Sequence, residues 1–237
     1  NTANTVVAGN GIGRFVQRGG THQVSQMLQI GLRNGSRGTY ELTGGRLSAF
    51  VESIGSTGTA PTNRSSLLQT GGLHEVRDEL RVGFQGTPGR LAVSGGLLQA
   101  SNLTLDDSWL DLVIDPSTNR IQVSGTARLG GVLRLTLAPG YRPLGGDTLT
   151  LMTYGNRQGT FGLTNLPPTS NGVVWSLEYQ PQALVLRASP PPEVVLVGPV
   201  TASPEPGLFQ QTITLSNNGT EPLQGSRIYF PGLPSGW

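Results

Sequence analysis

The sequence contains no cysteine and no lysine, and each absence excludes a kind of chemistry. Without cysteine there is no disulfide framework, and no thiolate can act as a nucleophile or a metal ligand. Without lysine there is no Walker-type phosphate loop and no Schiff-base catalysis. All 16 basic side chains other than histidine are therefore arginines.

Charge and long apolar runs are also scarce. Charged residues make up 13% of the chain, against about 25% in a typical domain. The net charge is +2 and no arginine-rich run occurs, so the sequence carries no nucleic-acid footprint. No apolar stretch approaches the roughly 20 residues that span a membrane, so we expect no membrane span in this segment.

Glycine, in contrast, is abundant, with 35 glycines in 237 residues, and it recurs in pairs. The pairs are spaced by 24 to 27 residues and stand at Gly19–Gly20, Gly44–Gly45, Gly71–Gly72 and Gly95–Gly96. The flanking sequence repeats as well, since FVQRGGTHQVSQMLQIG returns as LLQTGGLHEVRDELRVG. A period near 25 residues indicates a solenoid of stacked coils.

On both sides of each pair, positions expected to point into the core alternate with polar positions expected to point outward. The position two before each pair holds Gln17, Leu42, Gln69 and Val93. The position two after each pair holds His22, Leu47, His74 and Leu98. Alternation with a period of two is typical of strands with one buried face, and glycine suits a corner that has no room for a Cβ atom.

A third apolar segment follows in each repeat and ends at a further glycine, as at Gly31, Gly55 and Gly83. We therefore predict coils of three short strands and three corners, with like strands paired about 4.8 Å apart. The predicted fold is all-β, a right-handed parallel β-helix with coils of about 25 residues. The opening segment NTVVAGNGIG matches the end of a coil, so we expect the chain to begin inside one.

The pattern divides the chain into four parts. Residues 1–105 form the regular β-helix coils, and residues 106–188 are expected to form final irregular coils and a C-terminal β cap. Residues 189–193, SPPPE, form a proline-rich linker. Residues 194–237 favour the first strands of an immunoglobulin-like β-sandwich, and we expect that module to be partial because a whole one needs about 100 residues.

The units Q-x-G-G-x-H-x-V and G-x-Y-x-L-x-G-G-x-L-x-A resemble the β-helical repeats of large bacterial surface and exported proteins, such as autotransporter-type passengers. The segment LGGVLRLTLAPGYRPLGGDTLTLMTYGNRQGTFGLTNLP resembles the part that closes such β-helices. GLFQQTITLSNNGTEPLQGSRIYFPGLPSG resembles an immunoglobulin-like module of multidomain surface proteins. The resemblance implies an extracellular or cell-surface location in a bacterium and no shared active site.

The two histidines, His22 and His74, share one column two coils apart, beside the column of Gln17 and Gln69. A metal site or proton relay is one interpretation. However, two coils separate the Cα atoms by about 10 Å, too far for one zinc ion with bonds of about 2.1 Å. We instead expect a structural polar column in which each histidine hydrogen-bonds the glutamine of its own coil, with no metal and no cofactor.

The acidic cluster consists of Asp106, Asp107, Asp111 and Asp115. Asp107, Asp111 and Asp115 are expected to be exposed. Asp111 and Asp115 would lie about 13 Å apart on one strand, beyond the spacing of about 5–9.5 Å in glycosidase pairs. Three interpretations stay open: glycan catalysis, calcium or glycan binding, and a solvated strand face with a turn at Pro116. We favour the last.

The sequence thus predicts a non-enzymatic structural or adhesive protein, extracellular or on a bacterial surface, whose β-helix forms a stiff rod or assembles into fibres. Expected partners are other copies of the chain, neighbouring surface proteins and glycans. The competing class is a glycan-binding or glycan-active β-helix similar to polysaccharide lyases and hydrolases. A second carboxylate or an arginine lining a groove beside Asp111 would favour that class. Trp109, Trp175 and Tyr179 would then form a sugar platform; otherwise they are core residues.

Overall fold

The computed structural model describes residues 1–33, 35–55, 65–83, 87–117, 120–168 and 173–190, together with the backbone of four short strands between residues 193 and 216. Within these ranges the chain is all-β and contains no helix. Accordingly, no described helix has the length and apolarity needed to cross a membrane.

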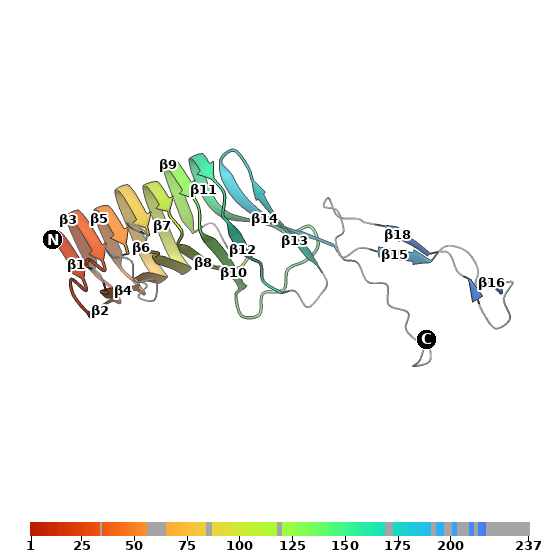
Figure 1. Cartoon of the computed structure of the whole chain (residues 1–237), viewed down its shortest axis with the longest axis horizontal. Coiled ribbons are helices and arrows are strands. Elements are labelled where there is room, and N and C mark those ends of the chain that lie inside the picture. Colours follow the sequence, from red (N-terminus) through yellow and green to blue (C-terminus); the bar gives the residue numbers. More distant parts are fainter. Residues whose placement is uncertain are drawn as a thin grey trace.

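The first fourteen strands form one continuous sheet that coils on itself (Figure 1). They are β1 (Thr2–Val7), β2 (Ile12–Gln17), β3 (Thr21–Ile30), β4 (Arg37–Leu42), β5 (Arg46–Ile54), β6 (Ser66–Val82), β7 (Arg90–Leu105), β8 (Trp109–Ile114), β9 (Ile121–Leu129), β10 (Val132–Leu137), β11 (Thr148–Gly159), β12 (Leu163–Asn165), β13 (Val174–Tyr179) and β14 (Ala183–Ser189).

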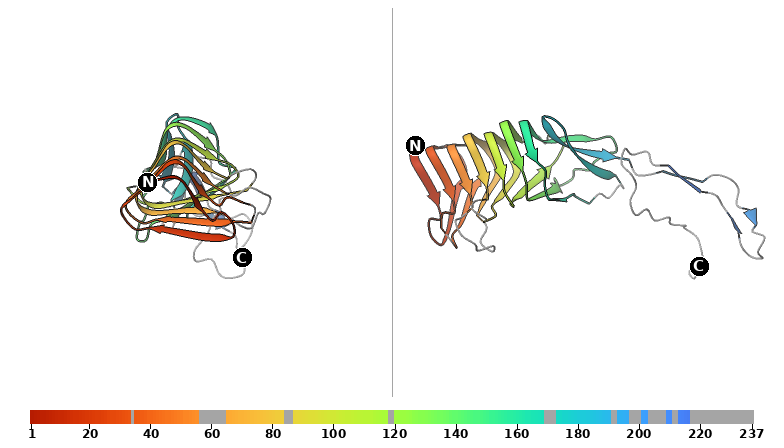
Figure 2. Two further views of the ribbon diagram at one scale, coloured as in Figure 1. Left: turned by 90° about the vertical axis from the view of Figure 1, so that its left-hand side faces the viewer. Right: turned by 45° about the horizontal axis from the view of Figure 1, so that its top comes forward.

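Two parallel stacks run along the solenoid. One follows the order β1-β3-β5-β6-β7-β9-β11, and the other joins β2, β4, β6, β7, β8, β10 and β12. Strands β6 and β7 belong to both stacks because each continues through its glycine corner. The end-on view in Figure 2 shows the turns superimposed. The predicted solenoid is confirmed, with about five turns.

The strand register reproduces the columns that the glycine alignment predicts. Gln17 pairs with Leu42, Leu42 with Gln69, and Gln69 with Val93. The histidine column is likewise in register, with His22, Leu47, His74 and Leu98 as successive partners. Residues equivalent in sequence are therefore neighbours in space along the axis.

The corners differ in construction. At the glycine corner, the second residue of each pair has a φ between 66° and 79°, a conformation that L side chains rarely adopt. A Cβ atom at Gly96 would lie 2.3 Å from the carbonyl oxygen of Gly72 in the coil below. The predicted second and third strands are instead one bent strand, with a bulge-like register shift between Ala49 and Glu52 in β5.

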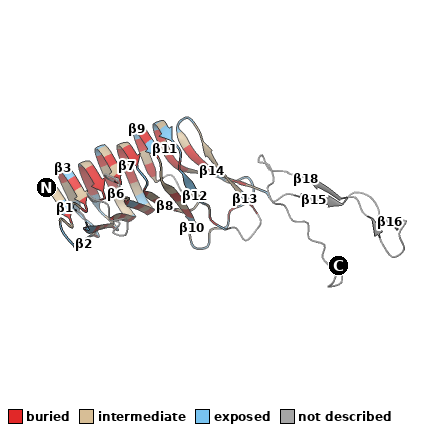
Figure 3. Ribbon diagram, in the orientation of Figure 1, coloured by how far each residue is buried: buried red, intermediate tan, exposed pale blue. Residues whose placement is uncertain are grey.

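Inward side chains fill a continuous apolar core, and Figure 3 shows the buried residues in red along the ribbon of the solenoid. One file of fully buried residues passes through the second stack and comprises Tyr40, Leu67, Leu91, Leu110 and Leu133. Each buried Leu contributes about 1.5–3 kcal/mol of hydrophobic free energy. Because every coil buries its inner face against the next, the core is shared along the rod.

The pairing changes direction at the far end of the solenoid. Strand β14 is antiparallel to β11, and β13 is antiparallel to β14. Trp175, Leu177 and Tyr179 of β13 pack, partly buried, against the core.

Beyond the solenoid, β15 (Glu193–Leu196) pairs with β18 (Ile213–Ser216), and β16 (Thr201–Ala202) pairs with β17 (Phe209–Gln210), both antiparallel. Apart from these backbones, the immunoglobulin-like module expected over 194–237 lies outside the described residues.

Candidate functional site

The polar column predicted at Gln17, His22, Gln69 and His74 lies inside the first turns of the rod. Gln17, Gln69 and His74 are buried, and His22 is partly buried. Inward polar groups must find partners in a solenoid core, because an unpaired buried group costs about 1–3 kcal/mol. Their partners decide whether the column is structural or chemically active.

Gln17 and His22 are joined through Tyr40, not by the direct hydrogen bond that the sequence predicts. The Tyr40 hydroxyl donates to Gln17 Oε1 at 2.6 Å, and His22 Nδ1 lies 2.9 Å from the same hydroxyl. Tyr40 belongs to β4 of the next coil and stacks on Phe15, with ring centroids 4.9 Å apart. Gln17 Nε2 also crosses to the next coil, where it donates to the carbonyl oxygen of Arg46 at 3.0 Å.

The hydrogen bonds define the tautomer of His22. Because the Tyr40 hydroxyl proton goes to Gln17, His22 Nδ1 carries a proton and donates it to Tyr40, while Nε2 lies 3.2 Å from the Thr5 hydroxyl. Burial lowers the pKa of His22, which favours this neutral form. Burial, together with the negative charge of Glu52, raises the pKa of Tyr40. The group is thus a neutral hydrogen-bonded network.

Removing the Tyr40 hydroxyl should destabilise the first coils. Tyr40→Phe leaves Gln17 Oε1 and His22 Nδ1 without partners, at a cost of about 1–3 kcal/mol for each group that stays buried. We expect the free energy of unfolding in urea to fall by that order, with unchanged circular dichroism of the folded protein. A variant as stable as the wild type would show that the two groups find other partners.

His74 is bonded to Glu52, not to Gln69, which corrects the second predicted pairing. His74 Nε2 lies 2.7 Å from Glu52 Oε2, and both side chains are fully buried. Sequence reasoning missed Glu52. Its position in the repeat could have revealed it, because the register places Glu52 between Leu28 and Leu80, in an inward column that is otherwise apolar.

Glu52, His74 and the nearby Gln69 each keep one polar atom that forms no hydrogen bond within the described residues. Glu52 Oε1, His74 Nδ1 and Gln69 Oε1 are buried and have no partner there. Gln69 Nε2, in contrast, donates to the carbonyl oxygens of Gly72 and Leu97. The polar column therefore ties coils together from within, since Gln17 and Gln69 each donate to a carbonyl oxygen of the next coil.

The predicted acidic cluster is dispersed. Asp106 and Asp107 are exposed at the corner before β8. Asp111 accepts a hydrogen bond from Arg90 at 2.6 Å, and Asp115 pairs with Arg120 at 2.6 Å. The expectation of exposure holds for Asp107. It is wrong for Asp111 and Asp115, whose side chains are only 16% and 24% exposed because each pairs with an arginine. Within the described residues, no group of three or more metal-ligating side chains exists.

Asp111 lies in a groove on the outer face of β6, β7, β8 and β10. The groove encloses about 490 Å³ and is lined by Arg90, Asp111 and Arg134, among others. Ala92 stands between Leu68 and Asp111 in the register, so a small side chain forms the floor between larger ones. Sequence reasoning named Asp111 but not the groove, because its lining comes from four successive coils.

The groove has an excess of positive charge, with two arginines and one carboxylate. Arg134 is the cross-strand neighbour of Asp111, and its guanidinium lies over the Trp109 ring, 5.7 Å from the centroid. None of the ion pairs formed between described residues involves Arg134. Asp111 Oδ1 is buried without a hydrogen-bond partner among the described residues. The groove thus holds one guanidinium without an acidic partner among the described residues, and one carboxylate that is already paired with Arg90.

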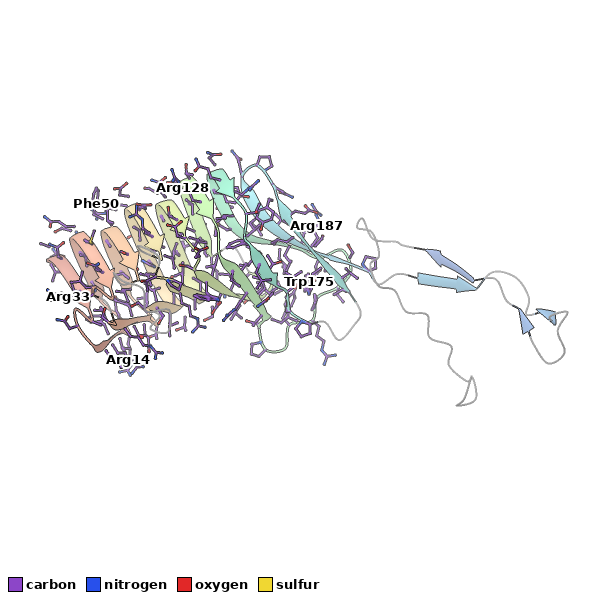
Figure 4. The ribbon with its side chains drawn as sticks, in the orientation of Figure 1. Arg14, Arg33, Phe50, Arg128, Trp175 and Arg187 are labelled. Carbon is purple, nitrogen blue, oxygen red and sulfur yellow. The ribbon has the colours of Figure 1, made fainter. Side chains whose placement is uncertain are left out.

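The three aromatic residues considered for a sugar platform, Trp109, Trp175 and Tyr179, lie in two different places. Trp175 donates its indole N–H to the carbonyl oxygen of Pro167 at 3.0 Å, and Tyr179 accepts from the backbone N–H of Phe161. Both pack against the core at the far end of the solenoid, where Figure 4 labels Trp175. Only Trp109 belongs to the groove face, so the three do not form one sugar platform.

No model of a known protein family, no curated protein and no solved structure matches this chain.

Proposed function

We propose that this chain is a non-enzymatic structural or adhesive rod, extracellular or on a bacterial surface. The observation that carries the proposal is the uninterrupted stack, in which inward residues stay in register from β4 to β10 while glycine corners seat one coil on another. Parallel strands about 4.8 Å apart hydrogen-bond each coil to the next along the whole axis, which supports a stiff rod. Its proposed partners are other copies of the chain or neighbouring surface proteins.

The ionisable side chains support a structural role. His22 and His74 belong to the core networks, and Asp111 and Asp115 are held by arginines. The surface location is supported by the repeat units, which resemble those of exported bacterial proteins such as autotransporter passengers.

We further infer that the solenoid is right-handed, that β13 and β14 form its C-terminal cap, and that an immunoglobulin-like module follows. The antiparallel pairing of β11, β14 and β13, with Trp175 and Tyr179 against the core, supports the cap. The alternating sequence after residue 193 supports the module.

A second candidate function is glycan binding or glycan cleavage, and one observation favours it. Arg90 and Arg134 line the groove beside Asp111, which is the feature that distinguishes this class from a bare rod. Asp111 has no second carboxylate in that groove, so binding is favoured over hydrolysis, which needs two carboxyl groups.

The proposal predicts adhesion without turnover. Beads coated with the purified chain should be retained under flow on polysaccharide-coated or cell-coated surfaces, several-fold above albumin-coated beads. The same polysaccharides incubated with the chain should release no reducing ends above the blank. Polysaccharide cleavage that is lost in Asp111→Ala would overturn the non-enzymatic role, and absence of retention on every surface would overturn the adhesive one.

A further inference from the structure

We propose that the groove over β6, β7, β8 and β10 binds an acidic oligosaccharide, one that carries uronic acid carboxylates among its hydroxyl groups. The inference rests on the glycan binding proposed above as the second candidate function and names its ligand class. Four successive strands line the groove, so its length is about 14 Å.

The carboxylate of the ligand is recognised by Arg134. A guanidinium offers a planar fork of donors that matches a carboxylate with two parallel hydrogen bonds. Arg134 has that fork available, because its partner among the described residues is the face of Trp109 and not an acid. Arg90 adds a second positive charge but already donates to Asp111. Arg134 is therefore the primary anion-binding residue.

The hydroxyl groups of the ligand are recognised by the hydroxyls of Thr70, Ser94 and Thr136, which line the same groove and can both donate and accept hydrogen bonds. Asp111 holds Arg90 in place, because its Oδ2 accepts a hydrogen bond from that guanidinium. Its Oδ1 is buried, so a ligand does not contact that oxygen.

Two other ligand classes fit less well. A peptide strand would bind through its backbone at an open sheet edge, but β6, β7, β8 and β10 are each paired on both sides. A nucleic acid carries a phosphate at every nucleotide and would meet only two arginines in this groove. An acidic saccharide supplies an anion for Arg134 and hydroxyl groups for the polar side chains of the lining.

The test is calorimetric titration of the whole chain with tetragalacturonic acid. The methyl-esterified tetramer, which has the same sugars without the charge, should bind at least about tenfold more weakly. Arg134→Gln should weaken binding of the acid by at least about tenfold, since a charge-assisted hydrogen bond is lost. Ala92→Phe, which fills the groove floor without changing any charge, should abolish binding.

The matched control is Arg14→Gln. Arg14 bonds Glu41 at 2.6 Å on the same outer face, as Arg90 bonds Asp111, but lies on β2 at the N-terminal end, outside the groove (Figure 4). The Arg14→Gln variant should bind tetragalacturonic acid as tightly as the wild type does. Equal affinity for acid and ester, or equal loss in Arg14→Gln and Arg134→Gln, would overturn the proposal. Equally tight binding of polyglutamate would do so as well.

The two proposals fail in different ways. Beads that adhere while tetragalacturonic acid does not bind leave the adhesive rod intact and remove only the assigned ligand. Beads that adhere to nothing remove the adhesive function itself, whatever the calorimetry shows.

Discussion

His74→Leu should lower the free energy of unfolding by about 1–3 kcal/mol, the usual cost of leaving a buried polar group without its hydrogen-bond partner. His74 Nε2 is the one described group bonded to the Glu52 carboxyl, at 2.7 Å, and both side chains are inaccessible to solvent. Leucine itself fits the column, since the register flanks His74 with Leu47 and Leu98. The loss therefore reports the stranded Glu52 carboxyl, and urea denaturation followed by circular dichroism measures it.

The double variant separates this cause from a packing defect. With Glu52→Leu and His74→Leu together, both polar groups are gone, and each leucine has leucines as its register neighbours. Replacing a whole buried pair by apolar residues is commonly neutral or stabilising, so stability should return to within about 1 kcal/mol of the wild type or exceed it. Additive losses in this double-mutant cycle would contradict an energetic pairing of the two residues.

Much of the solenoid can be predicted from the sequence because its unit is local. The glycine pairs set the corners, and alternation on either side sets the inward columns, so the spacing alone aligns Gln17, Leu42 and Gln69 in one column. Stacking then converts sequence periodicity into spatial register, which the strand pairing reproduces. In a repeat protein, a residue contacts the equivalent residue of the next repeat, so these long-range contacts can be predicted from the repeat length.

The polar partners could not be read in the same way. Hydrogen bonds between coils depend on side-chain length and direction, and Tyr40 occupies an ordinary apolar position while bridging Gln17 and His22. Glu52 breaks its apolar column, but only the structure shows that the histidine of the next coil reaches it. The outer groove is likewise a product of diagonal neighbours, such as Arg90 and Asp111, that no single repeat contains.

Gly96→Ala tests whether the glycine pairs hold the coils together. At φ 74° an alanine is strained by about 1–2 kcal/mol. Its Cβ would also lie 2.3 Å from the Gly72 carbonyl oxygen, and backbone cannot move aside as a flexible side chain can. Overpacking of this kind costs about 1–3 kcal/mol more. We therefore expect a total loss of about 2–5 kcal/mol in urea denaturation.

The first coil supplies the matched control, because it has the same corner without a neighbour close by. Gly20 has a φ of 66°, and a Cβ there would meet nothing within 4 Å, so Gly20→Ala should cost only the strain of about 1–2 kcal/mol. Gly19→Ala adds neither strain nor contact and should leave stability unchanged. The difference between Gly96→Ala and Gly20→Ala then measures coil-on-coil contact alone. Equal losses at the two positions would mean that the glycines serve backbone conformation and not the stacking of the rod.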